Sequence, residues 1–224
     1  MRGDRAYGLF TSLTVALGAI IVLEALRFSD GLQALNLLTL KELPYLTATW
    51  NRALTDSASL EAFALLAVVL YAVDAAADGK VSERTASFIV ALIVSMIVTA
   101  LLKAYTGVPR PMEPQAYFGL LGNLLNADYF SFPSGHTVRV TVLSYYVVSV
   151  FNNTKGRRAS YLVIPYAGAI MVTRLLLREH WLSDIIGGIL VGLWSSVLVE
   201  GPGRGVWRPI YEKTLGTVPW LRLS

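Results

Sequence analysis

Cysteine is absent from the 224-residue sequence, so the chain can form no disulfide bond and offers no thiolate as a metal ligand or nucleophile. Charged side chains are also scarce, at 15% of residues, whereas 54% are hydrophobic and the mean hydropathy is +0.55. Because soluble domains contain about a quarter charged residues, these values indicate a protein that crosses a membrane several times. No segment interleaves aromatic with basic residues, which argues against a nucleic-acid partner despite the formal net charge of +4.

Six apolar segments reach or approach the roughly 20 residues that a helix needs to cross a bilayer. They cover residues 7–27, 58–77, 86–105, 137–152, 160–178 and 184–200. The predicted fold is therefore an all-α bundle of six transmembrane helices, forming a single membrane-embedded domain over residues 1–224. The first segment is too long for the core of a signal peptide and is followed by no small-residue cleavage site, so it is predicted to be a retained span.

The distribution of Lys and Arg predicts the orientation of these helices, because cytoplasmic loops carry an excess of positive charge. An even number of spans places both termini on one side, and eleven Lys and Arg residues lie on that side. The opposite side carries eight, but three of them belong to the polar clusters described below, which leaves five. The sequence therefore predicts a multi-pass protein of the cell membrane, with cytoplasmic termini and an extracytoplasmic site.

The sequence also predicts the structure of three segments that connect the spans. Residues 28–57 alternate leucines with polar residues as far as Pro44, which predicts an interfacial helix, either a lid or lip for the substrate or an ordinary connector. The side chains of the unusually apolar residues 106–132 either pack on the outer ends of the helices, the safer interpretation, or contact lipid tails at the site entrance. Residues 152–160 predict a polar, basic cytoplasmic turn.

Three short polar clusters stand out between Lys103 and Asp184. They are Lys103 with Arg110-Pro111, the run PSGH at 133–136, and Thr173-Arg174 followed by His180 and Asp184. These clusters contain the only two histidines of the chain. An unpaired cation next to a long apolar run is costly. Three cations with two histidines and a carboxylate therefore indicate a site for a multiply charged anion, for which phosphate is the best match.

The clusters closely resemble the motifs of the type-2 phosphatidic acid phosphatase family, the membrane relatives of the vanadium haloperoxidases. The family pattern is Lys-x6-Arg-Pro, Pro-Ser-Gly-His and Ser-Arg-x5-His-x3-Asp, and here it reads KAYTGVPRP, PSGH and TRLLLREHWLSD. Thr173 replaces the usual serine and keeps the hydroxyl group. One motif alone is weak evidence, but three in order at the correct spacing are strong. The match covers about the second half of the chain, and the first half is similar only in hydropathy.

The resemblance implies roles for both histidines. His180 is the expected nucleophile, which attacks phosphorus to form a phosphohistidine, and Asp184 holds its ring and stabilises the developing positive charge. His136 is the expected general acid, which protonates the departing oxygen. The chemistry also requires positive charge at the phosphate oxygens. That charge is expected from Lys103, Arg110 and Arg174.

Local patterns predict how the chain presents these groups. Proline followed by Ser134-Gly135 favours a helix start, where free backbone N–H groups attract an anion. Gly135 lets the backbone approach the oxygens closely, and Ser134 caps the helix, donates to phosphate, or does both. Ser183-Asp184 predicts a second helix start, so two helix N-termini are expected to point at one phosphate. Gly187, Gly188 and Gly192 predict close helix packing along the last span.

Arg174 and His180 lie six positions apart, which places them about 240° apart on a continuous helix. We therefore predict that the fifth helix ends near Leu177 and that the following turn, 178–183, brings His180 back over the site. Arg139 either contacts the substrate or, as the preferred interpretation, pairs with Asp128 or Glu113. Glu179 is a candidate partner of Arg174 that offsets the excess of positive charge.

The predicted function is an integral membrane phosphatase that removes phosphate from a lipid phosphate or diphosphate at the outer leaflet. A polyprenyl diphosphate is the preferred substrate, and phosphatidic acid or phosphatidylglycerol phosphate is the alternative. A phosphotransferase that passes the phosphoryl group to a second lipid is a further possibility. An anion transporter is a remote one, because it leaves the paired histidines unexplained. No cofactor is predicted, and no metal site, since three nearby cations repel a metal ion.

Overall fold

The structure, a computed structural model, describes residues 3–26, 30–150 and 160–224, and its regular elements there are helices. The helices are α1 (Gly3–Leu26), α2 (Asp30–Glu42), α3 (Thr49–Asp56), α4 (Leu60–Asp78), α5 (Glu83–Thr106), α6 (Gly119–Leu125), α7 (Gly135–Tyr145), α9 (Val163–Leu176), α10 (Leu182–Glu200) and α11 (Arg204–Lys213). Single 3-10 turns lie at Ala127–Tyr129, Leu215–Thr217 and Pro219–Leu221, and α7 continues as a π-helix over Tyr146–Val150. Nearly all of the predicted turn at 152–160, and the predicted span ends at 27 and 151–152, lie outside the described residues.

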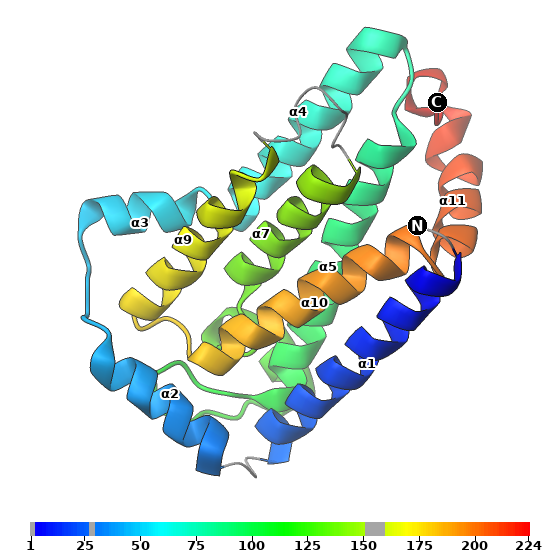
Figure 1. Cartoon of the computed structure of the whole chain (residues 1–224). Coiled ribbons are helices and arrows are strands. Elements are labelled where there is room, and N and C mark those ends of the chain that lie inside the picture. Colours follow the sequence, from blue (N-terminus) through cyan, green and yellow to red (C-terminus); the bar gives the residue numbers. More distant parts are fainter. Residues whose placement is uncertain (1–2, 27–29, 151–159) are drawn as a thin grey trace.

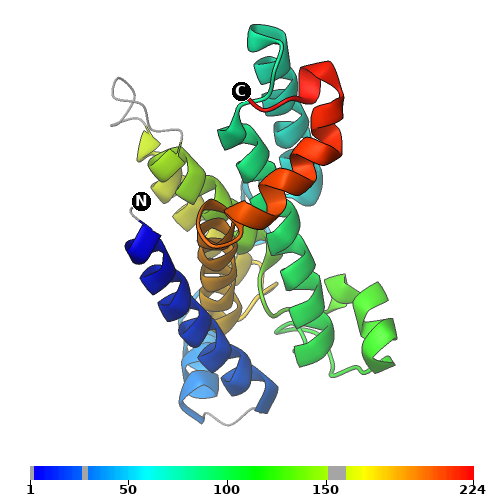
Figure 2. The same ribbon diagram turned by 90° about the vertical axis from the view of Figure 1, so that its right-hand side faces the viewer.

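Helix α10 is the centre of the bundle (Figure 1). It packs against α7, α5 and α1, while α9 packs on α7 and α4 on α5. The start of α1 and the end of α10 lie at the same end of the bundle, where a Cβ added at Gly201 would lie 3.4 Å from Ala6. The turn between α9 and α10 lies at the opposite end, near α2 (Figures 1 and 2). The polar clusters are therefore gathered at the end away from the termini.

Within the described part of the chain, four helices are long and apolar enough to cross a membrane: residues 6–25 of α1, together with α4, α5 and α10. Helix α9 is apolar but shorter, and α7 with its π-helical continuation reaches the undescribed residues. The prediction of an all-helical membrane bundle is therefore confirmed. The number of six spans and the cytoplasmic location of the termini stay predictions.

Small polar residues and glycines define the ends of α4 and α5. Ser59 and Ser82 cap α4 and α5, each accepting a hydrogen bond at 3.1 Å from the backbone N–H three residues on. Gly79 and Gly107 follow these two helices with φ values of 64° and 57°, a left-handed conformation that glycine adopts without steric cost. Lys103 consequently lies in the last turn of α5, beside the site.

Helices α7 and α10 approach each other closely through two glycines of α10, which confirms the predicted packing role. A Cβ at Gly188 would lie 2.9 Å from the carbonyl oxygen of Ser134 and 2.8 Å from the side chain of Thr137. A Cβ at Gly192 would lie 2.9 Å from the carbonyl oxygen of Val138. This contact fixes the first turn of α7, and hence His136, relative to α10.

Replacing Gly188 with alanine is expected to lower the free energy of unfolding by about 1–3 kcal/mol, because the added methyl group overpacks the contact with α7. Thermal unfolding of the purified protein in detergent measures the effect. Gly168→Ala in α9 is the matched control, since nothing lies within 4 Å of a Cβ added there. Equal stability of the two variants would contradict the close contact between α7 and α10.

The leucine-rich run before Pro44 forms a helix, α2, as the sequence predicts, and its place at the membrane interface stays a prediction. An extended segment that contains Pro44 joins α2 to a second helix, α3, which the sequence pattern did not predict. Helix α2 is attached to the start of α10, where the amide of Asn36 donates to the Ser183 hydroxyl at 2.9 Å and accepts from the Ser183 N–H at 3.0 Å. The backbone N–H of Leu46 also donates to the carbonyl oxygen of Leu176 at 3.0 Å. These long-range bonds, which local sequence patterns do not reveal, hold the segment against the α9–α10 turn.

Residues 106–132 pack on the protein only in part. Phe130 is fully buried and Tyr129 partly so, but most of the apolar side chains on and near α6 are exposed. The exposed ones are Tyr117, Phe118, Leu120, Leu121, Leu124 and Leu125. The buried Asn123 fixes α6 by donating to the carbonyl oxygen of Ala104 at 3.1 Å. Phe118 still contacts the rings of Tyr129 and Phe130. The packing interpretation is wrong for the other five side chains, because α6 is anchored through a polar residue and turns its apolar residues outward.

Candidate active site

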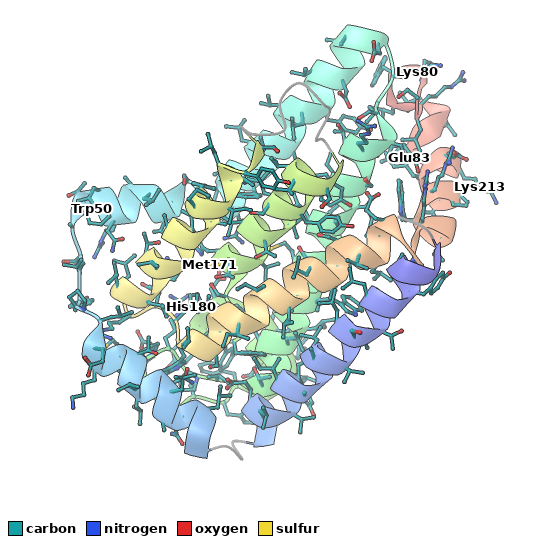
Figure 3. The ribbon with its side chains drawn as sticks, in the orientation of Figure 1. Trp50, Lys80, Glu83, Met171, His180 and Lys213 are labelled. Carbon is teal, nitrogen blue, oxygen red and sulfur yellow. The ribbon has the colours of Figure 1, made fainter. Side chains whose placement is uncertain are left out.

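His180 lies in the turn between α9 and α10, where its side chain is buried (Figure 3). Its Nδ1 atom is 3.2 Å from Oδ2 of Asp184, in the first turn of α10. The same carboxylate oxygen accepts from the backbone N–H of Trp181 at 2.7 Å, and the other oxygen accepts from the Ser131 hydroxyl at 3.4 Å. A carboxylate acceptor at Nδ1 places the ring hydrogen there and leaves the lone pair on Nε2.

The turn that carries His180 is built as the sequence predicts, although it lacks the usual glycine. Helix α9 ends at Leu176 with Leu177 as its C-cap. The N–H of Glu179 donates to the carbonyl of Arg174, and the N–H of Arg178 to the carbonyl of Leu175, both at 3.1 Å. These two bonds form a Schellman motif. Arg178 takes the left-handed position with φ of 58°, so the chain reverses directly after the helix.

The three predicted phosphate-binding cations lie around this turn and come from different elements. Lys103, buried at the end of α5, donates from Nζ to the carbonyl oxygen of Phe130 at 2.5 Å. Arg110 forms an ion pair with Glu179 and donates to the carbonyl of Asp128 at 2.7 Å. Arg174, also buried, lies 3.5 Å from the same Glu179 carboxylate oxygen. The prediction that Glu179 pairs with Arg174 is confirmed.

These cations act on the His180 ring electrostatically. Burial, reinforced by the positive charges of Arg174 and Lys103, lowers the pKa of His180 well below its ordinary value. The imidazole is therefore neutral at neutral pH. A neutral ring with a free nitrogen lone pair is the form in which histidine acts as a nucleophile.

The first turn of α7 contributes the PSGH cluster. Ser134 is fully buried, and its hydroxyl accepts from the Thr137 N–H at 3.5 Å as the N-cap of the helix. Its own N–H donates to the carbonyl oxygen of Asp184 at 3.1 Å. Of its two predicted roles, capping is thus confirmed. The next two residues, Gly135 and His136, carry the first N–H groups of the helix, which have no acceptor within a helix.

The first turn of α10 does not offer a second free helix N-terminus. Its N–H groups donate within the protein: Trp181 to the Asp184 carboxylate, Ser183 to Asn36, and Asp184 to the carbonyl of Trp181. The prediction of two helix N-termini at one phosphate is therefore wrong for α10. The reason is that acceptors in the turn itself take two of these N–H groups and α2, which is remote in sequence, takes the third. The start of α7 is left as the helix terminus available to an anion.

Arg139 has a structural role, but with other partners than predicted. Its Nε donates to the carbonyl oxygen of Ala58 at 2.8 Å, and its Nη1 lies 3.6 Å from the sulfur of Met96. It thus ties α7 to the segment before α4 and does not pair with Asp128 or Glu113, which lie on exposed positions of another loop. The structure also adds Thr55, whose hydroxyl accepts from Arg174 at 3.2 Å. No local sequence signal marks this threonine, 119 positions from its partner.

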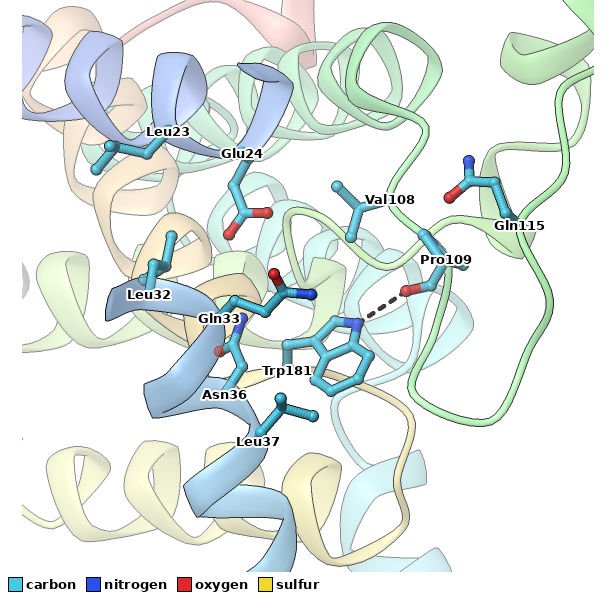
Figure 4. A pocket seen from close by; sticks show the side chains of 10 residues that line it. All are labelled: Leu23, Glu24, Leu32, Gln33, Asn36, Leu37, Val108, Pro109, Gln115 and Trp181. Carbon is cyan, nitrogen blue, oxygen red and sulfur yellow. Dashed lines mark hydrogen bonds between the residues drawn. The ribbon is translucent and has the colours of Figure 1, made fainter. Parts of the chain in front are cut away.

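A cavity of about 170 Å³ adjoins the site on the side of α1 and α2 (Figure 4). Leucines of these helices line it together with polar side chains that include Gln33, Asn36 and Gln115. Trp181 forms one wall, where its indole N–H donates to the carbonyl oxygen of Pro109 at 2.8 Å. This bond connects the residue after His180 with the residue before Arg110, and so couples the third motif to the first.

Comparisons with known proteins agree with the motifs. The sequence model of the PAP2 superfamily matches residues 84–200. Phosphatidylglycerophosphatase B of Bacillus subtilis (strain 168) is 30% identical over 84 residues, which are 35% of this chain and only 41% of that relative. The crystal structure of a transmembrane PAP2 type phosphatidylglycerolphosphate phosphatase from Bacillus subtilis superposes with a TM-score of 0.67 at 19% identity, covering 88% of this chain and 96% of the other. This chain belongs to the PAP2 superfamily.

Proposed function

We propose that this protein is a membrane lipid phosphatase in which His180 is the nucleophile. The observation that carries the proposal is the buried His180–Asp184 pair, with Nδ1 and Oδ2 3.2 Å apart, beside the arginines that share Glu179. If the charged residues here only formed structural ion pairs, a neutral, buried imidazole among them would have no role. A phosphoryl-transfer site requires both a nucleophile and positive charge at the transferred group.

The proposed reaction has two steps. Nε2 of His180 attacks phosphorus, the bond from phosphorus to the lipid oxygen breaks, and His136 gives that oxygen its proton. Water then attacks the phosphohistidine, with His136 accepting a proton from it, which releases inorganic phosphate and restores His180. Asp184 accepts from Nδ1 throughout and stabilises the positive charge that develops on the ring.

The remaining motif residues are proposed to bind the phosphoryl oxygens. Lys103, Arg110 and Arg174 neutralise their negative charge, and the planar guanidinium groups can each contact two oxygens. The N–H groups at the start of α7, next to Gly135, add backbone donors and the positive end of the helix dipole. Ser134 supports this arrangement as the cap of the helix.

For the substrate we propose phosphatidylglycerol phosphate. The names of the sequence relative and of the similar crystal structure both refer to phosphatases of this lipid. Composition and charge favoured a polyprenyl diphosphate, but neither of these two names refers to such a lipid. Metal independence stays part of the proposal, because three cations disfavour a metal ion at the same site.

We propose further that the site faces the extracytoplasmic side. The bundle has the site at one end and the start of α1 at the other (Figure 1), and the excess of Lys and Arg lies on the side of the termini. Five of the 19 residues on which this count depends lie outside the described residues, namely Arg2, Arg27, Lys155, Arg157 and Arg158.

The proposal is tested by measuring inorganic phosphate released by the purified protein from three lipids with EDTA present. We expect phosphatidylglycerol phosphate to give a higher kcat/KM than phosphatidic acid or a polyprenyl diphosphate. A higher value for the polyprenyl diphosphate would overturn the substrate assignment, and loss of release in EDTA would overturn metal independence. Release from none of the three lipids, followed by phosphoryl transfer when a second lipid is supplied as acceptor, would identify a phosphotransferase instead.

A further inference from the structure

Glu179 occupies a position that the motifs assign to no role. It is one of the five variable residues between Arg174 and His180. Its Oε2 atom pairs with Arg110, from the loop after α5, and lies 3.5 Å from Nη2 of Arg174, at the end of α9. A single carboxylate oxygen therefore bridges the two arginines that are proposed to bind the phosphoryl group.

The backbone holds Glu179 at this place. The Schellman bond from its N–H to the carbonyl oxygen of Arg174 fixes the residue relative to the end of α9. The side chain of Arg178 adds a second attachment, because it donates to the carbonyl oxygen of Leu43 at 2.7 Å. The carboxylate thus starts from a fixed backbone position, and only its own side-chain rotation can move it away from the arginines.

The bridging Glu179 carboxylate leaves part of the hydrogen-bonding capacity of the two arginines unused. Among the described residues, Nε of Arg174 is buried and has no hydrogen-bond partner. A carboxylate offers two oxygens and one negative charge, whereas a phosphate monoester offers three terminal oxygens and a charge of roughly −1.5 to −2 at neutral pH. A phosphoryl group is therefore the better ligand for the same donors.

Exposure shows which of the three side chains is free to leave. The Glu179 side chain is 36% exposed, against 8% for Arg174 and 25% for Arg110. The carboxylate can turn toward water, where it is well solvated, while Arg174 stays in place with Thr55 as a partner. An incoming phosphoryl group then accepts hydrogen bonds from the same guanidinium N–H groups of Arg110 and Arg174 that Glu179 has left.

We propose that Glu179 is a carboxylate stand-in for the phosphoryl group: it occupies the arginine pair in the ligand-free protein, is displaced by the lipid phosphate, and returns to help expel inorganic phosphate. This inference deepens the proposed function and rests on it. Competition of this kind lowers the apparent affinity for every phosphate ligand, since only the fraction of molecules with Glu179 displaced is competent to bind. It acts on substrate and product alike.

The test is Glu179→Gln, which keeps the size of the side chain and removes its charge, with Glu179→Ala as a second variant. We expect the dissociation constant for inorganic phosphate, measured by calorimetry, to fall roughly tenfold, equivalent to one charge-assisted hydrogen bond. KM for the lipid and the inhibition constant for phosphate are expected to fall by a similar factor, whereas kcat does not rise. Glu113→Gln is the matched control, because it removes the same charge from an exposed position three residues after Arg110.

Each outcome decides the proposal. Tighter phosphate binding in both Glu179 variants but not in Glu113→Gln supports it. Equal tightening in Glu113→Gln would show a general effect of net charge and overturn it. Unchanged or weaker binding in the Glu179 variants would also overturn it, since Glu179 would then only position the arginines. The calorimetric comparison needs no lipid turnover, so it separates this inference from the proposed function; only absence of phosphate binding in every protein, wild type included, would count against both.

Discussion

Replacing His180 with alanine is expected to abolish phosphate release, with kcat reduced by at least about four orders of magnitude, as for other enzymes that lose their nucleophile. The imidazole is the only side chain in the proposed mechanism that bonds to phosphorus. The remaining cations still bind phosphate, but they have nothing to which they can transfer it. Phosphate release from the lipid panel in detergent measures the loss, and a single-turnover reaction measures the covalent intermediate.

The same experiment must separate chemistry from folding. His180 is buried and its ring interacts with Asp184, so the variant is compared with the wild type by gel filtration and thermal unfolding in detergent. Phosphate bound to the protein by an acid-labile bond is expected in the quenched wild type and not in the variant. Persistent turnover in a folded His180→Ala protein would exclude the nucleophile assignment.

Asp184→Asn is expected to lower kcat by about two to four orders of magnitude without unfolding the protein. Asparagine has nearly the same shape, and its carbonyl oxygen can still accept from the Trp181 N–H, which lies 2.7 Å from the carboxylate in the wild type. The same oxygen faces Nδ1 of His180, so it can still accept from the ring as well. What the amide lacks is the negative charge, and it therefore stabilises the positive charge that develops on the ring during the attack much less than the carboxylate does.

Asp78→Asn is the control for this substitution. Asp78 is exposed at the end of α4, away from the α9–α10 turn (Figure 1). We expect its activity to stay within about a factor of two of the wild type, since screened surface charges contribute little. An Asp184→Asn protein as active as Asp78→Asn would contradict the role of the Asp184 charge in stabilising the ring.

The sequence alone predicted much of what depends on neighbours along the chain. Hydrophobic runs of about 20 residues predict membrane helices because the bilayer is about 30 Å thick. Serine caps and glycine ends predict helix boundaries through the free backbone groups of a helix. The six-residue spacing of Arg174 and His180 predicted the break after α9, since one helix cannot present both to one ligand.

Local sequence patterns did not predict the contacts between distant segments. Asn36 occupies the start of α10, Thr55 accepts from Arg174, and Arg139 bonds to the carbonyl of Ala58. In each case the partner belongs to the first part of the chain, which lies before the residues 84–200 that match the family model.

The sequence by itself determined the family, the helical membrane architecture and the side chains of the candidate site, because motif spacing and hydrophobic length are properties of the linear chain. Only the tertiary structure decided which helix terminus is available to an anion and that one carboxylate, Glu179, bridges Arg110 and Arg174. These features depend on where side chains meet in space. The distance between segments that are far apart in sequence is set by the packing of the whole bundle, and no local pattern encodes it.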